Sequence, residues 1–565
     1  MDALKFDLNA RGRKIFDLTL ELVNIPSTSR TPGERKIADA IHDRLSAWSY
    51  FKSHPHHLIS CPVKETGKRN VLALVRGAQH PSRRTLVYLG HMDTVDIKEY
   101  KSLEAAACDP ELLHQRLRTT ELPRDVAADL DSNQWLFGRG SADMKAGVAV
   151  LMELFREAAE NPESFSGNLV LAVVCDEEAD SQGMISLAEP LSELAAREGL
   201  DLLGGINTDV VSQRDGNAPH RRHIYFGAMG KIVPGVFVVG KGSHVGESLQ
   251  GFDVNQFLSR LTWLIDDNMD LSDAHDGEIT HPPVSLKQAD LKEDYNGQVP
   301  FEGYAYYNFL NYKRGPARVL EQVSELASRA FDDCVQRLSA QTRRFFQENN
   351  TDPIPMEISP RVMAFSELCD HVRTEQGQEV LDQVTARVCE TMGENPELRE
   401  HSLELVRAVW KASGLAGPAA VVFIMPPYYP ANDPEFDHPK FKAFNAQCRR
   451  SLAAFQAQDS PYELSLDAFF PYLSDASFCA YTEGPENRTA LESNMPCWGR
   501  GWDIDLDRVE QLNMPILDMG VHGKDFHKRF ERVHVPYSMG VLPGMIQAVT
   551  RSLLENKIEE AASDS

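Results

Sequence analysis

Short apolar runs alternate with helical patterns over the first part of the chain. Residues 71–77, 85–90 and 168–175 are nearly all apolar and are bounded by turn residues, which is typical of strands in a parallel sheet buried on both faces. Helical periodicity covers residues 12–48, with one loop inside, and residues 144–161. Strands that alternate with helices predict an α/β fold in which a mostly parallel sheet is covered by helices.

The pattern changes near residue 230, where a second module begins. Its expected elements follow the order β-α-β-β-α-β, at residues 231–244, 249–267, 282–292, 303–314, 317–346 and 360–365. This order predicts a compact α+β domain over residues 231–365, inserted into the α/β chain. Residues 366–416 are helical and acidic, and the buried-strand pattern returns at 418–430 and continues to a last helix near 542–560.

Charge and cysteine content narrow the choice of partners and compartment. The chain of 565 residues has 58 Lys and Arg against 83 Asp and Glu, a formal net charge of −25. An acidic surface repels phosphates, so neither a nucleic acid nor a membrane is an expected partner. The nine cysteines are scattered singly, without a CxxC pair. This arrangement argues against a disulfide framework and predicts a reducing compartment, the cytoplasm.

Acidic and histidine residues follow several of the apolar runs directly. In open α/β sheets, ligands bind at the carboxyl ends of the strands. Each cluster alone is explained by a surface pair, a turn or a helix cap, but their shared placement after successive strands favours one common site. Adjacent carboxylates repel one another unless cations compensate them. These residues are His91, Asp93, Asp143, Asp176, Glu177, Glu178 and Asp209, and three histidines, His522, His527 and His534, lie near the C-terminus.

The order of these motifs carries a resemblance. HMD, GRGSADMKAG, DEE, a strand-end Asp and a C-terminal His with Glu four residues later resemble a co-catalytic zinc metallopeptidase family. That family includes carboxypeptidase G, aminoacylase, succinyl-diaminopimelate desuccinylase and tripeptidase T. The segments FIMPPYYPAND, FFPYLSDASF and GKDFHKRFERV most resemble its bacterial arginine-utilisation branch. The resemblance implies a catalytic domain in two parts, 1–230 and 417–565, a lid domain over 231–365, and an extra helical segment over 366–416.

The resemblance also implies two divalent metal ions. The five implied ligands are His91, Asp143, Glu178, Asp209 and His527. Asp143 would bridge the two ions, His91 and Asp209 would complete one site, and Glu178 and His527 would complete the other. His527 is chosen among the three C-terminal histidines because a glutamate follows it by four residues, as in the family. Mixed histidine and carboxylate ligation suits zinc, with manganese or cobalt as alternatives.

Four further residues receive roles from the same resemblance. Asp93 would orient His91, and Glu177 would act as the general base. In the lid, His244 would bind substrate and stabilise the oxyanion, and Asn255 would bind substrate. The alternatives are purely structural roles: a core histidine for His244 and a cap of a helical turn for Asn255.

The expected function is hydrolysis of an amide or peptide bond in a small amino-acid-derived substrate or short peptide. An N-acyl amino acid, a dipeptide and an arginine-related amide all fit, which places the protein in arginine or other amino-acid catabolism. The alternative is a catalytically inactive small-molecule-binding or regulatory protein on the same fold. A phosphoesterase is a weaker rival, because nothing in the chain resembles a phosphate cradle. The extra helices leave both a monomer and a homodimer open.

Overall fold

In the computed structural model, the chain folds into two compact units. The first unit is made of Met1–Met229, Asn432–Thr482 and Asp505–Ser565, and the second of Gly230–Ala431 and Glu483–Ile504. The structure describes residues 4, 6–63, 66–80, 82–212, 220–352, 358–391, 397–458 and 460–555. The last five residues of the expected C-terminal helix, 556–560, lie outside this part of the chain.

The first unit contains the larger sheet and most of the helices. Its strands are β1 (Leu58–Pro62), β2 (Arg69–Arg76), β3 (Arg84–His91), β4 (Trp135–Phe137), β5 (Asn168–Val174), β6 (Asp201–Asn207), β7 (Arg221–Tyr225), β15 (Glu463–Asp467), β16 (Ile516–Asp518), β17 (Gly523–Lys524) and β18 (Arg532–His534). Its α-helices are α1 (Ala10–Val23), α2 (Pro32–Ser46), α3 (Ser49–Ser53), α4 (Pro110–Leu117), α5 (Arg124–Asp131), α6 (Ala146–Glu160), α7 (Gln182–Glu198), α13 (Pro439–Gln456), α15 (Leu506–Leu512) and α16 (Leu542–Glu555). Its 3-10 segments include η1 (Pro55–His57), η2 (Lys98–Ala106), η4 (Pro162–Ser164) and η7 (Asp475–Cys479).

The sheet of the first unit is mixed, with the strand order β1-β2-β5-β3-β6-β16-β7-β15. The pairs β5-β3, β3-β6, β6-β16 and β7-β15 are parallel. The pairs β1-β2, β2-β5 and β16-β7 are antiparallel. The α/β class is therefore confirmed. The antiparallel pairs were not foreseen, because a strand buried on both faces shows the same apolar run in either direction.

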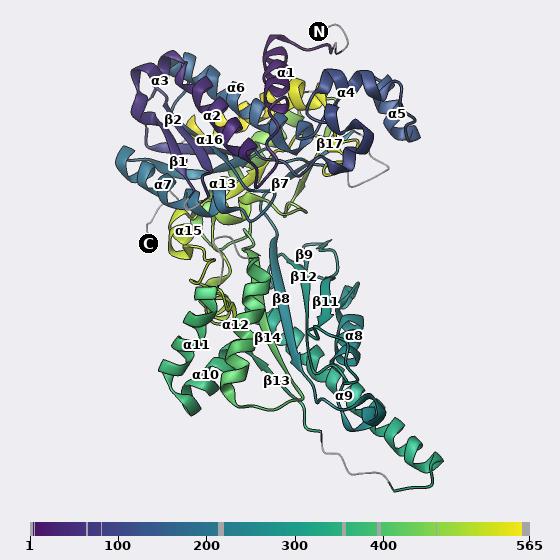
Figure 1. Ribbon diagram of the computed structural model, residues 1–565. Coiled ribbons are helices and arrows are strands. Elements are labelled where there is room, and N and C mark those ends of the chain that lie inside the picture. The colour runs from purple at the N-terminus through teal and green to yellow at the C-terminus, as the bar shows by residue number, and fades with distance from the viewer. Residues whose placement is uncertain are drawn as a thin grey trace. The chain divides into compact units, whose positions relative to one another are not determined.

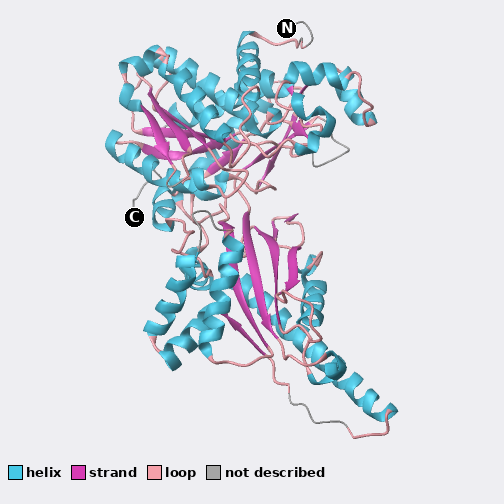
Figure 2. Ribbon diagram, in the orientation of Figure 1, coloured by secondary structure: helices cyan, strands magenta, loops and turns pink. Residues whose placement is uncertain are grey.

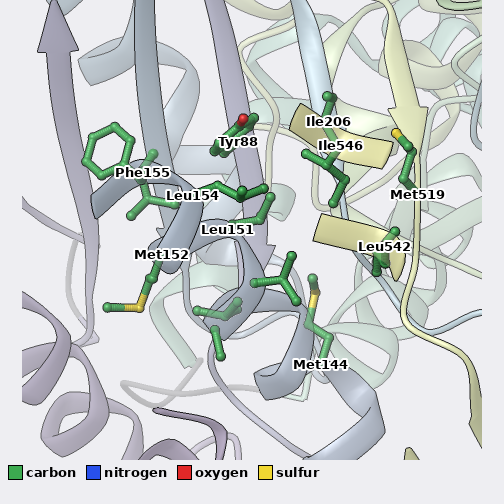
Figure 3. Packing of buried hydrophobic residues seen from close by; sticks show 14 of the residues in the cluster. Tyr88, Met144, Leu151, Met152, Leu154, Phe155, Ile206, Met519, Leu542 and Ile546 are labelled. Carbon is green, nitrogen blue, oxygen red and sulfur yellow. The ribbon is translucent and has the colours of Figure 1, made fainter. Parts of the chain in front are cut away.

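One apolar core joins this sheet to its helices. Tyr88 of β3 is 1% exposed and packs with Leu151 of α6 and Ile546 of α16 in the cluster that Figure 3 shows. The Tyr88 hydroxyl is hydrogen-bonded to Thr550 Oγ1 at 2.7 Å, which satisfies its polar end inside this core. Helix α6 crosses β2, β3 and β5. It therefore fixes the carboxyl ends of β3 and β5 relative to each other.

The second unit has its own sheet, with the strand order β11-β12-β8-β14-β13. Its strands are β8 (Gly230–Val239), β9 (Ala274–His275), β10 (Glu278–Ile279), β11 (Val284–Asp290), β12 (Glu302–Asn311), β13 (Arg361–Ala364) and β14 (Ala419–Tyr429). Its α-helices are α8 (Val254–Ile265), α9 (Pro316–Glu348), α10 (Phe365–Gln376), α11 (Gln378–Thr391), α12 (Leu398–Ser413) and α14 (Gly484–Asn494). Helices α10, α11 and α12 cover one face of this sheet, and α8 and α9 cover the other (Figures 1 and 2).

The boundaries of the second unit differ from the expected ones. The module β8-α8-β11-β12-α9-β13 follows the expected order, but β14 pairs with both β8 and β13 and so belongs to this sheet. Residues 366–416 are likewise no separate segment, because Leu368, Val406 and Val409 share a core with Phe423 of β14. Residues 417–431 and 483–504 therefore lie in the second unit and not, as expected, with the first. In the described part of the chain, no helix is long and apolar enough to cross a membrane.

A glycine in α6 allows this helix to approach the end of β6. A Cβ atom on Gly147 would lie 2.4 Å from the Thr208 carbonyl oxygen and 2.7 Å from its Oγ1. We predict that Gly147→Ala lowers the free energy of unfolding by about 1–3 kcal/mol through overpacking, measured by urea denaturation. Gly544→Ala in α16 is the matched control, because its Cβ would meet only Phe455 Cε2, at 3.9 Å. Equal effects of the two substitutions would contradict the prediction.

Candidate metal centre

His91 ends β3, between β5 and β6, and is 2% exposed. Its Nε2 atom lies 3.1 Å from Asp143 Oδ1 and 4.0 Å from Asp209 Oδ1. Asp209 follows β6 and is 5% exposed. Asp143 lies in the segment between β4 and α6. The three residues come from three segments far apart in the sequence, and the sheet brings them together.

A second group forms on the other side of Asp143. His527, in the loop between β17 and β18, has its Nε2 atom 3.0 Å from Asp143 Oδ2 and 2.9 Å from Glu178 Oε2. Asp143 therefore presents one carboxylate oxygen to His91 and the other to His527. Glu178 follows β5, in the turn that leads to α7. This arrangement places one carboxylate between two potential cation sites.

The spacing and chemistry of these groups fit two divalent ions. In His91–Asp143–Asp209 and in Asp143–Glu178–His527, one donor atom from each residue lies within 4.8 Å of the others. Zinc ligands lie about 2.0–2.3 Å from the ion, so atoms of one tetrahedral shell are roughly 3.3–3.7 Å apart. The Nε2–carboxylate distances in the two trios run from 2.9 to 4.0 Å and span this range, so small side-chain shifts would bring either trio to it. Imidazole and carboxylate donors are the types that zinc accepts.

Three carboxyl groups of the cluster, those of Glu177, Glu178 and Asp209, resist ionisation in the absence of cations. Burial raises the pKa of Glu177 well above its ordinary value, and Glu178 adds to the shift while His91 opposes it. Burial, reinforced by Asp143, raises the pKa of Glu178 to about 7 and that of Asp209 to about 6. Cations bound here would favour the ionised forms and remove the cause of these shifts.

The two histidines of the cluster, unlike these carboxyl groups, favour their charged forms. Burial alone would lower the pKa of His527, but hydrogen bonds to Asp143 and Glu178 outweigh it and raise the pKa to about 10. The same balance raises the pKa of His91 above its ordinary value, with Asp143 as the main partner. Burial would raise the pKa of Asp143, but His527 and His91 together hold it well below its usual range. Without metal, the site is a cluster of imidazolium–carboxylate pairs.

Asp93 was expected to orient His91, and in the structure its backbone carbonyl, not its carboxylate, contacts the His91 ring. The His91 Nδ1 atom lies 3.1 Å from the backbone carbonyl oxygen of Asp93, whereas the Asp93 carboxylate lies 3.7 Å away. That carboxylate accepts hydrogen bonds from the backbone N–H groups of Glu177 and Glu178, each at 3.1 Å. Asp93 thus orients His91 through its main chain and fixes the turn that carries both glutamates through its side chain.

Glu531 supports Asp143 in a similar way. Its carboxylate is fully buried and accepts from the backbone N–H groups of Ala142 at 3.1 Å and Asp143 at 3.2 Å. Arg139 donates to the same carboxylate at 2.6 Å, so the buried charge is paired. The glutamate that follows His527 by four residues therefore supports the backbone of Asp143.

Asp176, the first residue of the DEE triplet, faces away from the cluster. Lys68 Nζ donates to its carboxylate and also lies 3.0 Å from Glu34 Oε2. The N–H of Gln182, the first residue of α7, donates to Asp176 Oδ2 at 3.1 Å. One carboxylate of the triplet is therefore neutralised by lysine and caps a helix, and the other two remain for the site.

The sequence reasoning assigned no role to Asp475, which also lies in this region. Asp475 begins η7, is 4% exposed, and interacts electrostatically with His91, Asp93 and Asp209. Burial raises its pKa well above the ordinary value. A signal for Asp475 was present in the segment FFPYLSDASF, because a single carboxylate stands there in a largely apolar run. Its burial beside the cluster depends on η7 packing against β3 and α7.

The other two C-terminal histidines belong to a different environment. His522 is 3% exposed, and its ring lies 5.6 Å from Trp135 and 5.9 Å from His534, between centroids. Burial, together with Arg222, lowers the pKa of His522 well below its ordinary value. A neutral ring packed among aromatic side chains is a core histidine.

His244 and Asn255 belong to the second unit. His244 is exposed and precedes a short 3-10 segment, Val245–Gln250, where its Nδ1 atom accepts from the N–H of Gly246 at 3.1 Å. Asn255, in α8, donates from Nδ2 to Asp290 Oδ2 at 3.0 Å. The exposed His244 ring is not the core histidine of the alternative explanation. Asn255 makes a contact that a structural role alone would explain.

Comparison with known proteins adds an independent result. A model of peptidase family M20/M25/M40 matches residues 87–412, more than half of the chain. The chain is 30% identical over 550 residues to Protein RocB of Bacillus subtilis (strain 168), covering 96% of each chain. It is also 30% identical over 550 residues to the uncharacterized protein YqjN of the same organism, again covering 96% of each. A solved M20 family metallo-carboxypeptidase, Sso-CP2 from Sulfolobus solfataricus, is 10% identical, covers 96% of this chain and 99% of its own, and has a TM-score of 0.49.

The raised pKa values of the two histidines predict a proton change on metal binding. A histidine must be neutral to bind a metal ion, so the imidazolium groups of His91 and His527 lose protons as ions enter. We expect at least one proton per chain to be released on zinc uptake at neutral pH. Zinc affinity should rise with pH, because the protonated rings compete with the ion below their pKa. Titration calorimetry of metal-free protein in two buffers of different ionisation enthalpy measures the release. Uptake without proton release would contradict this charge balance.

Proposed function

Because the chain belongs to peptidase family M20/M25/M40, we propose that it hydrolyses an amide or peptide bond of a small amino-acid-derived substrate. The observation that carries this proposal is the position of Asp143, whose two carboxylate oxygens face His91 and His527. A carboxylate between two cation sites is what a two-metal hydrolase needs, since the ions must lie close enough to act on one substrate group.

The proposed cofactor is a pair of divalent ions, zinc in preference to manganese or cobalt. Asp143 would hold both ions, His91 and Asp209 one of them, and Glu178 and His527 the other. Bound ions would polarise the scissile carbonyl and lower the pKa of the attacking water. The two imidazole donors are the reason for preferring zinc, because oxygen-rich sites without histidine suit harder ions.

Glu177 is the proposed general base. Its Oε2 atom lies 4.0 Å from His91 Nε2, and it forms a further trio of donor atoms with His91 and Glu178, so it borders the cluster. The two trios that share Asp143 would hold the ions without it. Its buried carboxylate would accept a proton from the attacking water and pass it to the leaving amine. Hydrogen bonds from the N–H groups of Glu177 and Glu178 to Asp93 keep the base and its neighbouring ligand in fixed relative positions.

His244 and Asn255 are proposed to act on the substrate from the second unit. An exposed imidazole can donate a hydrogen bond to the oxyanion that forms as the carbonyl is attacked. Asn255 can offer an amide group to a polar part of the substrate if its hydrogen bond to Asp290 opens. These two assignments rest on the motif GKGSHVGESLQGFDVN.

The proposed substrates are N-acyl amino acids, dipeptides or arginine-related amides, and the proposed setting is amino-acid catabolism. The arginine-utilisation motifs FIMPPYYPAND and GKDFHKRFERV favour the last of these. We place the protein in the cytoplasm, because all nine cysteines are free thiols. Both a monomer and a homodimer remain compatible with the proposal.

The function is tested by metal content and turnover together. Metal-replete protein should hold about two ions in this centre and release amino acid from part of a panel of N-acyl amino acids, dipeptides and arginine amides. Glu177→Gln should retain the metal and lose at least ~100-fold in activity, because the amide cannot accept the proton. Glu178→Gln should weaken binding of one ion. Asp180→Asn, in the same turn but paired with Arg30, is the matched control and should change neither.

Three outcomes of this experiment would count against the proposal. Fewer than one bound ion would remove the two-metal centre. Full metal content without turnover of any substrate would favour the inactive binding protein on the same fold. Metal loss in Glu177→Gln together with retained metal in Glu178→Gln would reverse the roles of the two glutamates.

The role of His244 is a separate prediction. If His244 stabilises the transition state, His244→Ala should lower kcat and kcat/KM together and leave metal content unchanged. A change in KM alone would indicate substrate binding without oxyanion stabilisation. His281→Ala provides the control, since His281 is also an exposed histidine of the second unit. Equal kinetics of the two variants and the wild type would remove His244 from the mechanism.

A further inference from the structure

A second cluster of metal-binding side chains lies in the first unit, away from the candidate centre. His56 and His57 belong to η1, and Glu198 is the last residue of α7. One donor atom from each of the three lies within 4.8 Å of the others. Helix α7 has 17 residues and begins just after the turn that carries Glu178. Its two ends are about 25 Å apart, at 1.5 Å per residue, so the two clusters are distinct.

The local contacts hold these side chains in place. His57 Nε2 lies 3.6 Å from Glu198 Oε2, and the rings of His56 and His57 meet edge to face with centroids 4.4 Å apart. Arg197 donates to the backbone carbonyl oxygen of His56 at 3.3 Å and to Glu198 Oε1 at 3.1 Å. The η1 segment is thus already attached to the end of α7 before any ion is bound.

His57 is oriented as a metal ligand usually is. Its Nδ1 atom lies 3.1 Å from the hydroxyl of Tyr50, whose oxygen also accepts the backbone N–H of Arg76 at 2.9 Å. When His57 Nδ1 carries the proton and donates to that oxygen, the lone pair of Nε2 points towards Glu198. A hydrogen bond from the second ring nitrogen is the common means of fixing a ligating histidine.

Protonation and exposure also favour a cation here. His57 is 3% exposed, and burial lowers its pKa to about 4, so the ring is neutral at physiological pH. Arg76 is the main cause that lowers the pKa of Glu198 to about 2, so its carboxylate is ionised. His56 is exposed, which leaves the cluster open to solvent for a water ligand. Neither His57 nor Glu198 has to lose a proton to bind a metal ion at neutral pH.

Two guanidinium groups compete for the same carboxylate. Arg76 donates to Glu198 Oε2 at 2.9 Å, and Arg197 donates to Oε1. Each carboxylate oxygen has two lone-pair directions, so Oε2 retains one for an ion. The positive charges nevertheless weaken the attraction for a dication, and we expect lower affinity than at the candidate centre.

We propose that His56, His57 and Glu198 form a further zinc site that joins η1 to the C-terminal end of α7. Two imidazoles and one carboxylate are a donor set that zinc accepts, with a water molecule as the fourth ligand. The role of the ion is structural, because the site lies at the far end of α7 from Glu177 and Glu178. Hydrolysis should not depend on it.

The test compares zinc stoichiometry and thermal stability of the full-length protein. At free zinc sufficient to fill the candidate centre and then raised further, wild-type protein should bind one more ion per chain than His56→Ala. The midpoint of thermal unfolding should rise with the added zinc in the wild type and not in His56→Ala. His56 is exposed, so its removal leaves no cavity. His80→Ala is the matched control, an exposed histidine outside the cluster, and should behave as the wild type.

Glu198→Gln provides a second variant, with reduced zinc binding expected although it keeps the size of the side chain. Its failure to fold would not affect the comparison of His56→Ala with His80→Ala. Equal zinc stoichiometry in His56→Ala and the wild type would overturn the proposal. A zinc-dependent rise of the unfolding midpoint in His56→Ala as large as in the wild type would do the same. In either case the histidines form only an aromatic stack beside Tyr50. Within this stack the rings of His54 and His57 lie 5.3 Å apart between centroids.

Discussion

Mutual repulsion among buried carboxylates is the constraint around which the first unit is organised. Glu177, Glu178 and Asp209 are held close to His91 and Asp143 at the ends of the strands, where burial and like charge both oppose their ionisation. Such a cluster is stable only when protons or cations neutralise it. The same repulsion that would destabilise an empty site would favour the binding of divalent ions there.

The scaffold opposes this repulsion with supports that lie outside the cluster. Asp93 anchors the turn of the two glutamates through their backbone N–H groups. Glu531, paired with Arg139, accepts hydrogen bonds from the backbone N–H groups of Ala142 and Asp143. These supports use main-chain groups, so they fix the position of each carboxylate without occupying its lone pairs. A two-metal hydrolase needs this, because ligands that are positioned in advance need not reorganise when the ions and substrate arrive.

The two ends of α7 illustrate how one element serves two purposes. Its first turn is capped by Asp176, which Lys68 neutralises, and so it extends the structure that holds Glu177 and Glu178. Its last residue, Glu198, joins Arg76 of β2, the neighbouring Arg197 of α7 and His57 of η1. If zinc binds at that end, it would stabilise the helix that begins at the candidate centre, without contacting the reacting groups.

The sequence by itself determined the α/β class, the order of elements in the inserted module and the residues at the strand ends. Those features depend on local periodicity and on motif order, which the chain displays directly. Only the tertiary structure decided that β14 joins the sheet of the second unit, because strand pairing is chosen among partners distant in sequence. It also decided the side-chain role of Asp93 and the burial of Asp475. Both depend on which segments the fold brings within hydrogen-bonding or packing distance, and no local pattern records that distance.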